Sequence, residues 1–252
     1  MRQYILPNNF KGESPFKLKG KDSQYFTRVL RLKKNDKILA RDKNGLSYQL
    51  TVLEFDKSSC LLDVVKLKSG ESFESTDELP SFVGDYPKLH LFQAVCKGKK
   101  NETIIKMATE LGVSSITLVQ SEHCIAKKES SNTDRYEAIV KEAIQQSGSP
   151  IMTQFNKITT FKDFVNCLNI PLLFFHQINI DEKVSLKEKL KDFDTSTPIG
   201  IFIGPEGGFS DKECKILLDK NCIPVMLKTN ILRAETAAIV ALSAIHTLLM
   251  EK

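Results

Sequence analysis

The sequence predicts an α/β protein of two domains: a small antiparallel β-barrel in residues 1–79 and a larger parallel-sheet domain in residues 80–252. Its 252 residues exceed the ~100–150 residues of a typical single domain. Before residue 80, short β-branched and aliphatic runs alternate with turn residues, which is typical of antiparallel strands. After Pro87, strand-like runs alternate with helical periodicity, which indicates a parallel sheet covered by helices.

The first domain is predicted from three short apolar runs separated by turn signals. The runs lie at residues 37–40, 48–53 and 60–65, and the turns at 34–36, 44–45 and 56–59. Their close spacing favours a compact barrel of antiparallel strands. The polar stretch 69–77, followed by Pro80 and Pro87, predicts a linker to the second domain.

The second domain is predicted from alternating strands and helices. Strands are expected at residues 89–95, 115–120, 172–176, 199–203 and 224–228. Helices are expected at about residues 101–111, 133–146, 181–191, 211–220 and 234–250. The apolar residues of 101–111 share one helical face, and Gly112 follows them as a stop signal.

Composition excludes several classes of protein. Hydrophobic residues make up 41% and charged residues 27%, as in ordinary globular proteins. The longest apolar stretch, 236–250, is shorter than the ~20 residues that a bilayer requires, and residues 1–4 lack a signal-peptide pattern. The six cysteines form no Cys-x-x-Cys pair and no cluster with histidine, so we expect no metal site and a reducing, cytoplasmic location.

Positive charge is concentrated near the start of the chain. Residues 1–43 hold 12 Lys and Arg against 4 Asp and Glu, whereas residues 44–79 hold 3 against 7. The net charge of the whole chain is only +5, so most of the positive excess lies in this N-terminal part. Such an asymmetry favours a surface that binds a polyanion. A solvated surface without a partner is the alternative interpretation.

The most informative motif is Gly204-Pro205-Glu206-Gly207-Gly208. It follows a predicted buried strand and precedes a helix whose Ser210 and Glu213 have the spacing of a capping box. Ligands of parallel sheets bind at the carboxyl ends of strands, where this loop lies, and glycines allow the backbone to approach them. The spacing matches neither a Walker loop nor a dinucleotide fingerprint. A plain structural turn remains the alternative.

A second loop leads from the strand at 224–228 into the last helix and carries Arg233 and Glu235. An acidic residue in the first turn of a helix is stabilised by the helix dipole alone, and Arg233 is an available ion partner for it. Together, however, the two loops predict a small-molecule cleft with an acidic group, a cation and glycine-lined backbone.

These motifs carry a family resemblance. Together with 109–113 (Thr-Glu-Leu-Gly-Val), 29–31 (Val-Leu-Arg) and 231–237 (Ile-Leu-Arg-Ala-Glu-Thr-Ala), the 204–208 motif resembles the ribosomal RNA small subunit methyltransferase E family of the SPOUT superfamily. The resemblance implies a PUA-like β-barrel joined to an α/β domain with a trefoil knot. It also implies methylation of N3 of a uridine in 16S rRNA of the small ribosomal subunit, with S-adenosylmethionine as methyl donor, by a homodimer.

The resemblance also implies roles for single residues. Glu235 is expected to remove the N3 proton or orient the base, and Arg233 to stabilise the developing anion. The expected cofactor-binding residues are Phe175, His176, Ile203, Gly204, Pro205, Glu206, Gly207, Gly208, Leu227, Lys228, Ile231, Leu232 and Ala237. The expected RNA-binding residues are Arg2, Arg28, Arg31, Lys33, Lys34 and Lys100.

The chain departs from the family pattern mainly around the expected substrate side. The family usually carries an arginine where this chain has Ser149, a glutamate at Gln145, and arginines at His123 and Asn230. These departures leave two alternatives open: a methyltransferase of this type that acts on another RNA, and a non-catalytic RNA-binding protein that keeps the fold.

Overall fold

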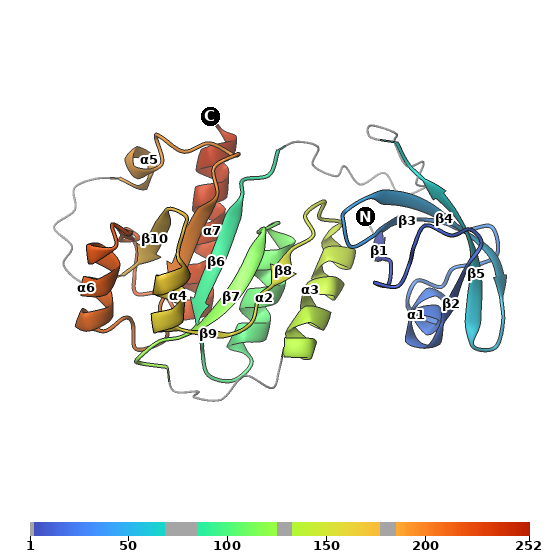
Figure 1. The fold of residues 1–252 in the computed structure, drawn as a ribbon, viewed down its shortest axis with the longest axis horizontal. Helices are drawn as coiled ribbons and strands as arrows, with labels where there is room; N and C mark the ends of the chain where they lie inside the picture. Colours follow the sequence, from blue (N-terminus) through green and yellow to red (C-terminus); the bar gives the residue numbers. More distant parts are fainter. Residues whose placement is uncertain (1–2, 69–84, 125–132, 177–184) are drawn as a thin grey trace. The chain divides into compact units, whose positions relative to one another are not determined.

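The computed structural model describes residues 3–68, 85–124, 133–176 and 185–252 (Figure 1). The chain divides into two compact units, Met1–Phe82 with Ile144–Met152, and Val83–Ala143 with Thr153–Lys252. The expected boundary at 79/80, the polar stretch 69–77, Arg2 and the start of the expected helix 181–191 lie outside the described residues.

The N-terminal unit is built on a five-stranded sheet in the order β1-β3-β4-β5-β2. Its strands are β1 (Gln3–Ile5), β2 (Phe16–Lys19), β3 (Lys37–Arg41), β4 (Ser47–Phe55) and β5 (Ser59–Lys66). The three expected strands are confirmed as β3, β4 and β5. The expectation of a wholly antiparallel sheet is wrong in one place, because β1 pairs with β3 in parallel. Strands β1 and β2 are only 3 and 4 residues long and show too few alternations to be recognised in the sequence.

Two short helical segments, α1 (Gly20–Gln24) and the π-helical turn η1 (Tyr25–Val29), follow β2. They bring Phe26 into the core of this unit, where it packs edge-on against Tyr4 with 4.8 Å between ring centroids. Leu50 and Leu62 complete this core from β4 and β5. A fully buried aromatic and aliphatic core of this kind fixes the strands around it.

Residues 144–152 belong to the N-terminal unit although they follow helix α3 (Thr133–Ser147) of the other. Gln3 donates from Nε2 to the carbonyls of Ile144 and Ser149, at 3.0 and 2.8 Å. Gln145 accepts a hydrogen bond from the Ile5 backbone at 3.1 Å. The side chains of Gln145 and Ser149 are buried. Two of the departures from the family pattern therefore lie in a buried polar junction with β1.

The second unit contains an all-parallel sheet in the order β12-β10-β11-β6-β7-β8, with β9 also paired to β7. Its strands are β6 (Leu89–Ala94), β7 (Ser115–Gln120), β8 (Gln154–Phe155), β9 (Thr159–Thr160), β10 (Leu172–Phe175), β11 (Ile199–Ile203) and β12 (Ile223–Val225). The expected parallel sheet is confirmed. The expected strand 224–228 is wrong at its end, because the chain leaves the sheet after Val225.

Helices cover both faces of this sheet, which is the usual environment of buried parallel strands. They are α2 (Lys100–Glu110), α3, α4 (Phe161–Cys167), α5 (Leu186–Lys189), α6 (Asp211–Asp219) and α7 (Ala234–Met250). Helices α2 and α7 pack on each other behind the sheet in Figure 1, and α4 lies in front of it. Helix α4 was not expected, since its 7 residues are too few for a clear helical period. Its local signal is the cap that Thr160 forms with the backbone of Asp163.

We predict that Gly200→Ala destabilises the second unit. A Cβ at this position of β11 would lie 2.6 Å from Leu172 Cδ1 and 3.0 Å from Phe92 Cε2, in a closely packed layer. Overpacking of this kind costs about 1–3 kcal/mol, measurable as a lower urea midpoint by circular dichroism. Because Leu172 makes the shortest contact, the double variant Gly200→Ala/Leu172→Ala should be less destabilised than the sum of the single variants. Strict additivity would contradict the prediction.

Candidate functional site

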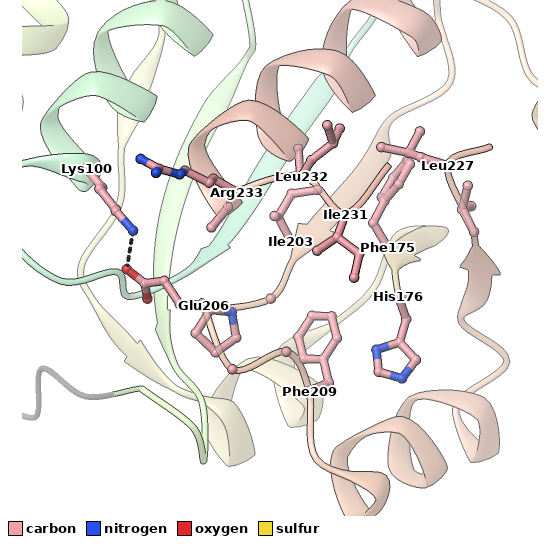
Figure 2. Close-up of a pocket in the computed structure, with 17 residues that line it drawn as sticks. Lys100, Phe175, His176, Ile203, Glu206, Phe209, Leu227, Ile231, Leu232 and Arg233 are labelled. Atoms are coloured by element: carbon pink, nitrogen blue, oxygen red, sulfur yellow. Dashed lines mark hydrogen bonds and ion pairs between the residues drawn. The ribbon is translucent and has the colours of Figure 1, made fainter. Parts of the chain in front are cut away.

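A cavity of about 450 Å³ opens at the carboxyl ends of β10, β11 and β12 (Figure 2). Phe175, Ile203 and Val225 end these three strands and line it. Its walls are the loop after β11, the loop after β12 and the start of α7. The cavity is lined by Lys100, Phe175, His176, Ile203, Gly204, Pro205, Glu206, Gly207, Gly208, Phe209, Val225, Leu227, Ile231, Leu232, Arg233, Ala234 and Ala237. The carboxyl edge of a parallel sheet is the usual place for such a site.

The loop 204–208 is held in a tight turn by its own sequence and by Phe209. The Gly208 amide donates to the Pro205 carbonyl at 2.9 Å, and Gly208 has a φ of +69°, a conformation that favours glycine. The ring of Phe209 is buried beneath the loop and lies 4.6 Å from the ring of Phe202. The turn therefore rests on the aromatic core while its backbone faces the cavity.

The loop after β12 supplies the opposite wall. Leu227, Ile231 and Leu232 line the cavity, and Ile231 is 86% exposed. Lys228 is the one expected cofactor-binding residue that does not line the cavity. Its side chain lines a separate hollow of about 210 Å³ next to α5. Every other residue expected to bind the cofactor lines the larger cavity.

One end of the cavity is polar (Figure 2). Lys100 donates to Glu206 Oε1 at 2.8 Å, and the Lys97 backbone amide donates to the same oxygen at 3.2 Å. Partial burial alone would raise the pKa of Glu206, but these hydrogen bonds lower it below the ordinary glutamate value. Arg233 occupies the N-cap position of α7 without a side-chain capping hydrogen bond, and its exposed side chain lines the cavity. A carboxylate, an ammonium and a guanidinium thus share this end.

Glu235, in the first turn of α7, lies behind the polar end and does not line the cavity itself. Its Oε2 is 3.7 Å from Lys100 Nζ. That oxygen is buried and accepts no hydrogen bond from any residue that the structure describes. Among the described residues, the ion partner of Glu235 is Lys100. The sequence had suggested the neighbouring Arg233 as a possible partner.

The other end of the cavity is apolar. Phe175 and His176 follow the end of β10, and the His176 amide donates to the Val225 carbonyl at 3.0 Å. Burial lowers the pKa of His176, although the nearby carboxylate of Asp211 partly offsets this. At neutral pH the imidazole is therefore uncharged, and this end suits a neutral, flat ligand group.

A buried carboxylate, Glu213, ties the loop after β11 to the loop after β7. Its side chain accepts hydrogen bonds from Ser121 Oγ at 3.0 Å, the Glu122 amide at 2.9 Å and the Ser210 amide at 3.0 Å. Ser210 in turn accepts from the Glu213 amide, so the expected capping box is confirmed. This network holds the end of the 204–208 loop against the body of the unit.

His123 also supports the loop. Its Nδ1 lies 3.2 Å from the carbonyl oxygens of both Gly207 and Gly208. A Cβ on Gly207 would lie 3.1 Å from the His123 Cβ, so glycine permits this close approach. The residue that departs from the family pattern here is thus a neighbour of the candidate cofactor loop.

The sequence does not predict every residue of the site. Lys100, an expected RNA-binding residue, lines the cavity, and its ammonium lies 2.8 Å from Glu206 Oε1. Gln93, fully buried on β6, donates from Nε2 to the Ala94 carbonyl and lies 3.4 Å from the Gly204 carbonyl. Phe209 had a local signal, an apolar residue directly before a capping box. Gln93 had none, because its partner lies 111 residues away in the chain.

The other expected RNA-binding residues that the structure describes lie in the N-terminal unit. Arg28 is on η1, and Arg31, Lys33 and Lys34 follow it; all four side chains are exposed. Arg31 has a φ of 54° and ends the helical segment in the left-handed region. None of the four forms an ion pair with an acidic residue in the described part of the chain. They form a short exposed basic segment, residues 28–34.

The described residues show no sign of two other kinds of site, a membrane span and a metal centre. In the described ranges, no helix combines the length and apolar character needed to cross a membrane. Within the same ranges, no three His, Cys, Asp or Glu side chains gather in a way that would hold a metal ion.

Comparisons with known families match both parts of the chain. An RNA methyltransferase PUA domain matches residues 18–72, and an RNA methyltransferase domain matches residues 85–246. The expected combination of a PUA-like domain with an α/β methyltransferase domain is thereby confirmed.

Two relatives extend the match along the chain. Ribosomal RNA small subunit methyltransferase E 2 of Borreliella burgdorferi is 28% identical over 99% of this chain and 98% of its own length. Ribosomal RNA small subunit methyltransferase E of Synechocystis is 31% identical over 89% of this chain and 70% of its own length.

Solved structures share the fold. A ribosomal RNA small subunit methyltransferase E from Neisseria gonorrhoeae, solved with bound S-adenosyl methionine, aligns with a TM-score of 0.80 and 24% identity over 98% of each chain. A probable rRNA-methyltransferase from Porphyromonas gingivalis aligns with a TM-score of 0.79 and 22% identity over 99% of each chain.

We predict that Glu213→Gln lowers the free energy of unfolding by about 1–3 kcal/mol. The amide replaces one acceptor oxygen with a donor, so a buried donor among Ser121, Glu122 and Ser210 loses its partner. Urea denaturation followed by circular dichroism measures the change. Lys215→Ala, at an exposed position of the same helix, is the matched control and should stay within about 0.5 kcal/mol of the wild type. Equal stability of the two variants would contradict the prediction.

Proposed function

We propose a function from one premise, that the chain belongs to the ribosomal RNA small subunit methyltransferase E family of RNA methyltransferases. The protein transfers a methyl group from S-adenosylmethionine to N3 of a uridine in 16S rRNA. One observation carries the proposal: the loops 204–208 and 227–232 enclose a single cavity whose polar end holds Arg233 and lies next to Glu235.

The residues present fit an adenosine-containing methyl donor. The cavity of about 450 Å³ lies in the ~300–1,000 Å³ range of small-molecule sites. Phe175, Leu227 and Leu232 would hold the adenine ring at the apolar end. A Cβ on Gly208 would meet nothing within 4 Å, so bare backbone faces open space there. When bound, S-adenosylmethionine supplies the methyl group that is transferred.

The side chains at the polar end would handle the proton and the charge. Uracil N3 carries an imide proton that must leave before or during methylation. The Glu235 side chain, which is 22% exposed beside the polar end, would accept that proton. Arg233 would stabilise the negative charge that develops on the base. Holding the reacting groups in place contributes about 7–11 kcal/mol in favourable cases, so the protein does not need a nucleophilic side chain of its own.

RNA capture is the proposed role of the basic segment 28–34, together with Arg2. Its four described cations are exposed, which supports contact with phosphates. The target base would be unstacked to enter the cavity, as is usual for enzymes that modify a base.

The proposal extends to the assembly and topology of the protein. We propose a homodimer, which is supported by exposed apolar side chains on α2, on the loop after β12 and on α7: Met107, Ile231 and Val240. A trefoil knot in the second unit and a cytoplasmic location are proposed on the family relationship. The small ribosomal subunit is the proposed partner.

Two alternative functions predict different results in a methyl-transfer assay with ribosomal RNA. A methyltransferase for another RNA would modify a nucleotide outside 16S rRNA, and a non-catalytic binding protein would transfer no methyl group. The departures at Gln145 and Ser149 favour neither alternative, because both side chains are buried in the N-terminal unit.

We predict that the purified protein transfers labelled methyl groups to small ribosomal subunits and that nucleoside analysis identifies 3-methyluridine. Glu235→Gln should lower the transfer rate by about 10²–10⁴-fold, the usual contribution of a general base. It should leave the affinity for S-adenosylmethionine in calorimetry nearly unchanged, since Glu235 does not line the cavity. An unchanged rate would remove Glu235 as the base, and a different methylated nucleoside would overturn the proposed substrate.

We also predict that Arg28→Gln and Arg31→Gln weaken binding to small subunits mainly through phosphate contacts. Each change should reduce the slope of log affinity against log salt concentration by about 0.7–0.9. Filter binding at several salt concentrations measures this slope. Lys57→Gln is the matched control, since Lys57 is exposed in the same unit within its acidic stretch. An equal reduction for Lys57→Gln would argue against a localised RNA-binding face.

A further inference from the structure

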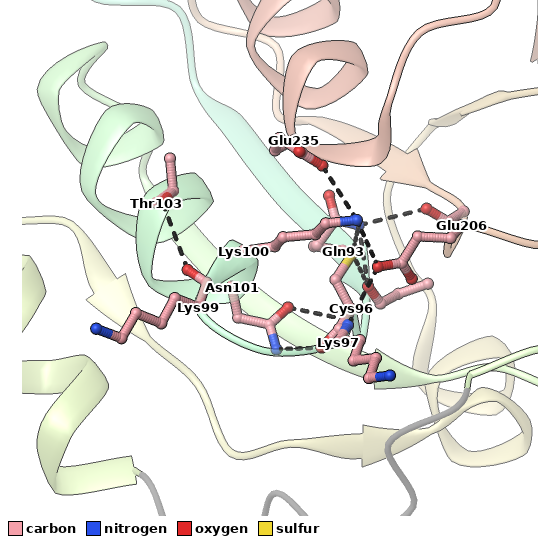
Figure 3. A network of polar contacts seen from close by, with 11 residues as sticks. Gln93, Cys96, Lys97, Lys99, Lys100, Asn101, Thr103, Glu206 and Glu235 are labelled. Atoms are coloured by element: carbon pink, nitrogen blue, oxygen red, sulfur yellow. Dashed lines mark hydrogen bonds and ion pairs between the residues drawn. The ribbon is translucent and has the colours of Figure 1, made fainter.

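One ammonium group joins the two walls of the cavity. Lys100 Nζ, at the start of α2, lies 2.8 Å from Glu206 Oε1 and 3.7 Å from Glu235 Oε2 (Figure 3). Glu206 belongs to the loop after β11, and Glu235 belongs to the first turn of α7. The chain brings these acidic residues from two separate segments to one cation.

The three side chains are partly buried, with exposed fractions of 31%, 27% and 22% for Lys100, Glu206 and Glu235. The hydrogen bond with Glu206 raises the pKa of Lys100, and the same bond helps to lower the pKa of Glu206. The ion pair therefore stays charged throughout the neutral range. Without the ammonium, two carboxylates would face each other in a partly dry space.

No other described group near Lys100 supplies a positive charge between Glu206 and Glu235. Burial raises the pKa of the Cys96 thiol to about 12, and burial also raises the pKa of Cys124, so both thiols are neutral. The guanidinium of Arg233 extends from the start of α7 on the same side as Lys100 (Figure 2). Among the described residues, the ion pairs of Glu206 and Glu235 are formed with Lys100 and not with Arg233. Lys100 is the described cation that bridges the two carboxylates.

We propose that Lys100 is a positioning residue: its ammonium holds the 204–208 loop and the start of α7 at a fixed spacing, so that Glu235 is aimed at the reacting base. This inference rests on the proposed function. It assigns Lys100 to the methyl-transfer site and not to an RNA phosphate. In this role Lys100 acts on the reaction through Glu206 and Glu235.

Three variants test the proposal. Lys100→Met removes the charge but keeps the length of the side chain, and Lys100→Arg keeps the charge. Lys106→Met is the matched control, because Lys106 pairs with Glu110 at 4.0 Å on the exposed side of the same helix.

Lys100→Met should lower kcat for methyl transfer to small subunits by about 10- to 100-fold, as expected when a reacting group is misplaced. It should weaken binding of S-adenosylmethionine in calorimetry by about three- to fivefold. The affinity for small subunits and its salt slope should not change. Lys100→Arg should restore most of kcat, and Lys106→Met should behave as wild type.

Thermal unfolding gives a readout that is independent of activity. The midpoint of Lys100→Met should lie about 1–3 °C below that of the wild type at neutral pH. Because the pKa of Glu206 is lowered in the folded protein, this difference should persist through mildly acidic pH. It should disappear as the pH falls through that lowered pKa, below the ordinary value of 4.5. Lys100→Met should also be non-additive with Glu206→Gln and with Glu235→Gln.

Two results would overturn the proposal. In the first, Lys100→Met leaves kcat unchanged at saturating RNA but reduces the salt slope by about 0.7–0.9, as a phosphate contact would. In the second, the unfolding effects of Lys100→Met and both glutamate variants are additive. If the wild type transfers no methyl group, the proposed function fails, but the unfolding cycles still decide whether Lys100 bridges the two walls.

Discussion

The candidate site depends on the buried carboxylate of Glu213. Burying a charge is costly unless hydrogen bonds compensate it, and here Ser121, Glu122 and Ser210 supply three donors. Those donors come from the loop after β7 and from the end of the loop after β11. The same interaction that satisfies the charge therefore fixes where the 204–208 turn can lie, and with it one wall of the cavity.

The two ends of the cavity differ in polarity. At the apolar end, a neutral imidazole and aliphatic side chains favour burial of an uncharged ring. At the polar end, Lys100, Glu206 and Arg233 create a charged environment, with Glu235 behind it. In the proposed function, the nucleobase of the methyl donor would occupy the apolar end, and its charged methionyl part, which carries both an ammonium and a carboxylate, would occupy the polar end. The orientation of such a ligand would follow from this gradient, because exchanging its ends would bury charge among apolar groups.

Local signals made the 204–208 motif, the capping box at Ser210 and most of the second unit predictable from sequence, because each depends on neighbouring residues. The junction at Gln145 and the bridge at Lys100 were not predictable. The partner of Gln145 is Ile5, 140 residues away, and the partner of Lys100 is Glu206, 106 residues away. The periodicity of a sequence indicates secondary structure but not contacts between such distant residues. The sequence therefore gives no reason to separate Gln145 from the residues expected on the substrate side. In the structure its side-chain oxygen accepts a hydrogen bond from the Ile5 amide of β1.

His123 shows how a departure from the family pattern can preserve a site. Backbone carbonyls only accept hydrogen bonds, so the His123 Nδ1 that faces the carbonyls of Gly207 and Gly208 must carry the proton. An arginine at this position would also be a donor. The substitution thus keeps a donor against the same turn with a shorter and more rigid side chain. With the two carbonyls held on the His123 side, the turn keeps the conformation in which its bare backbone faces the cavity.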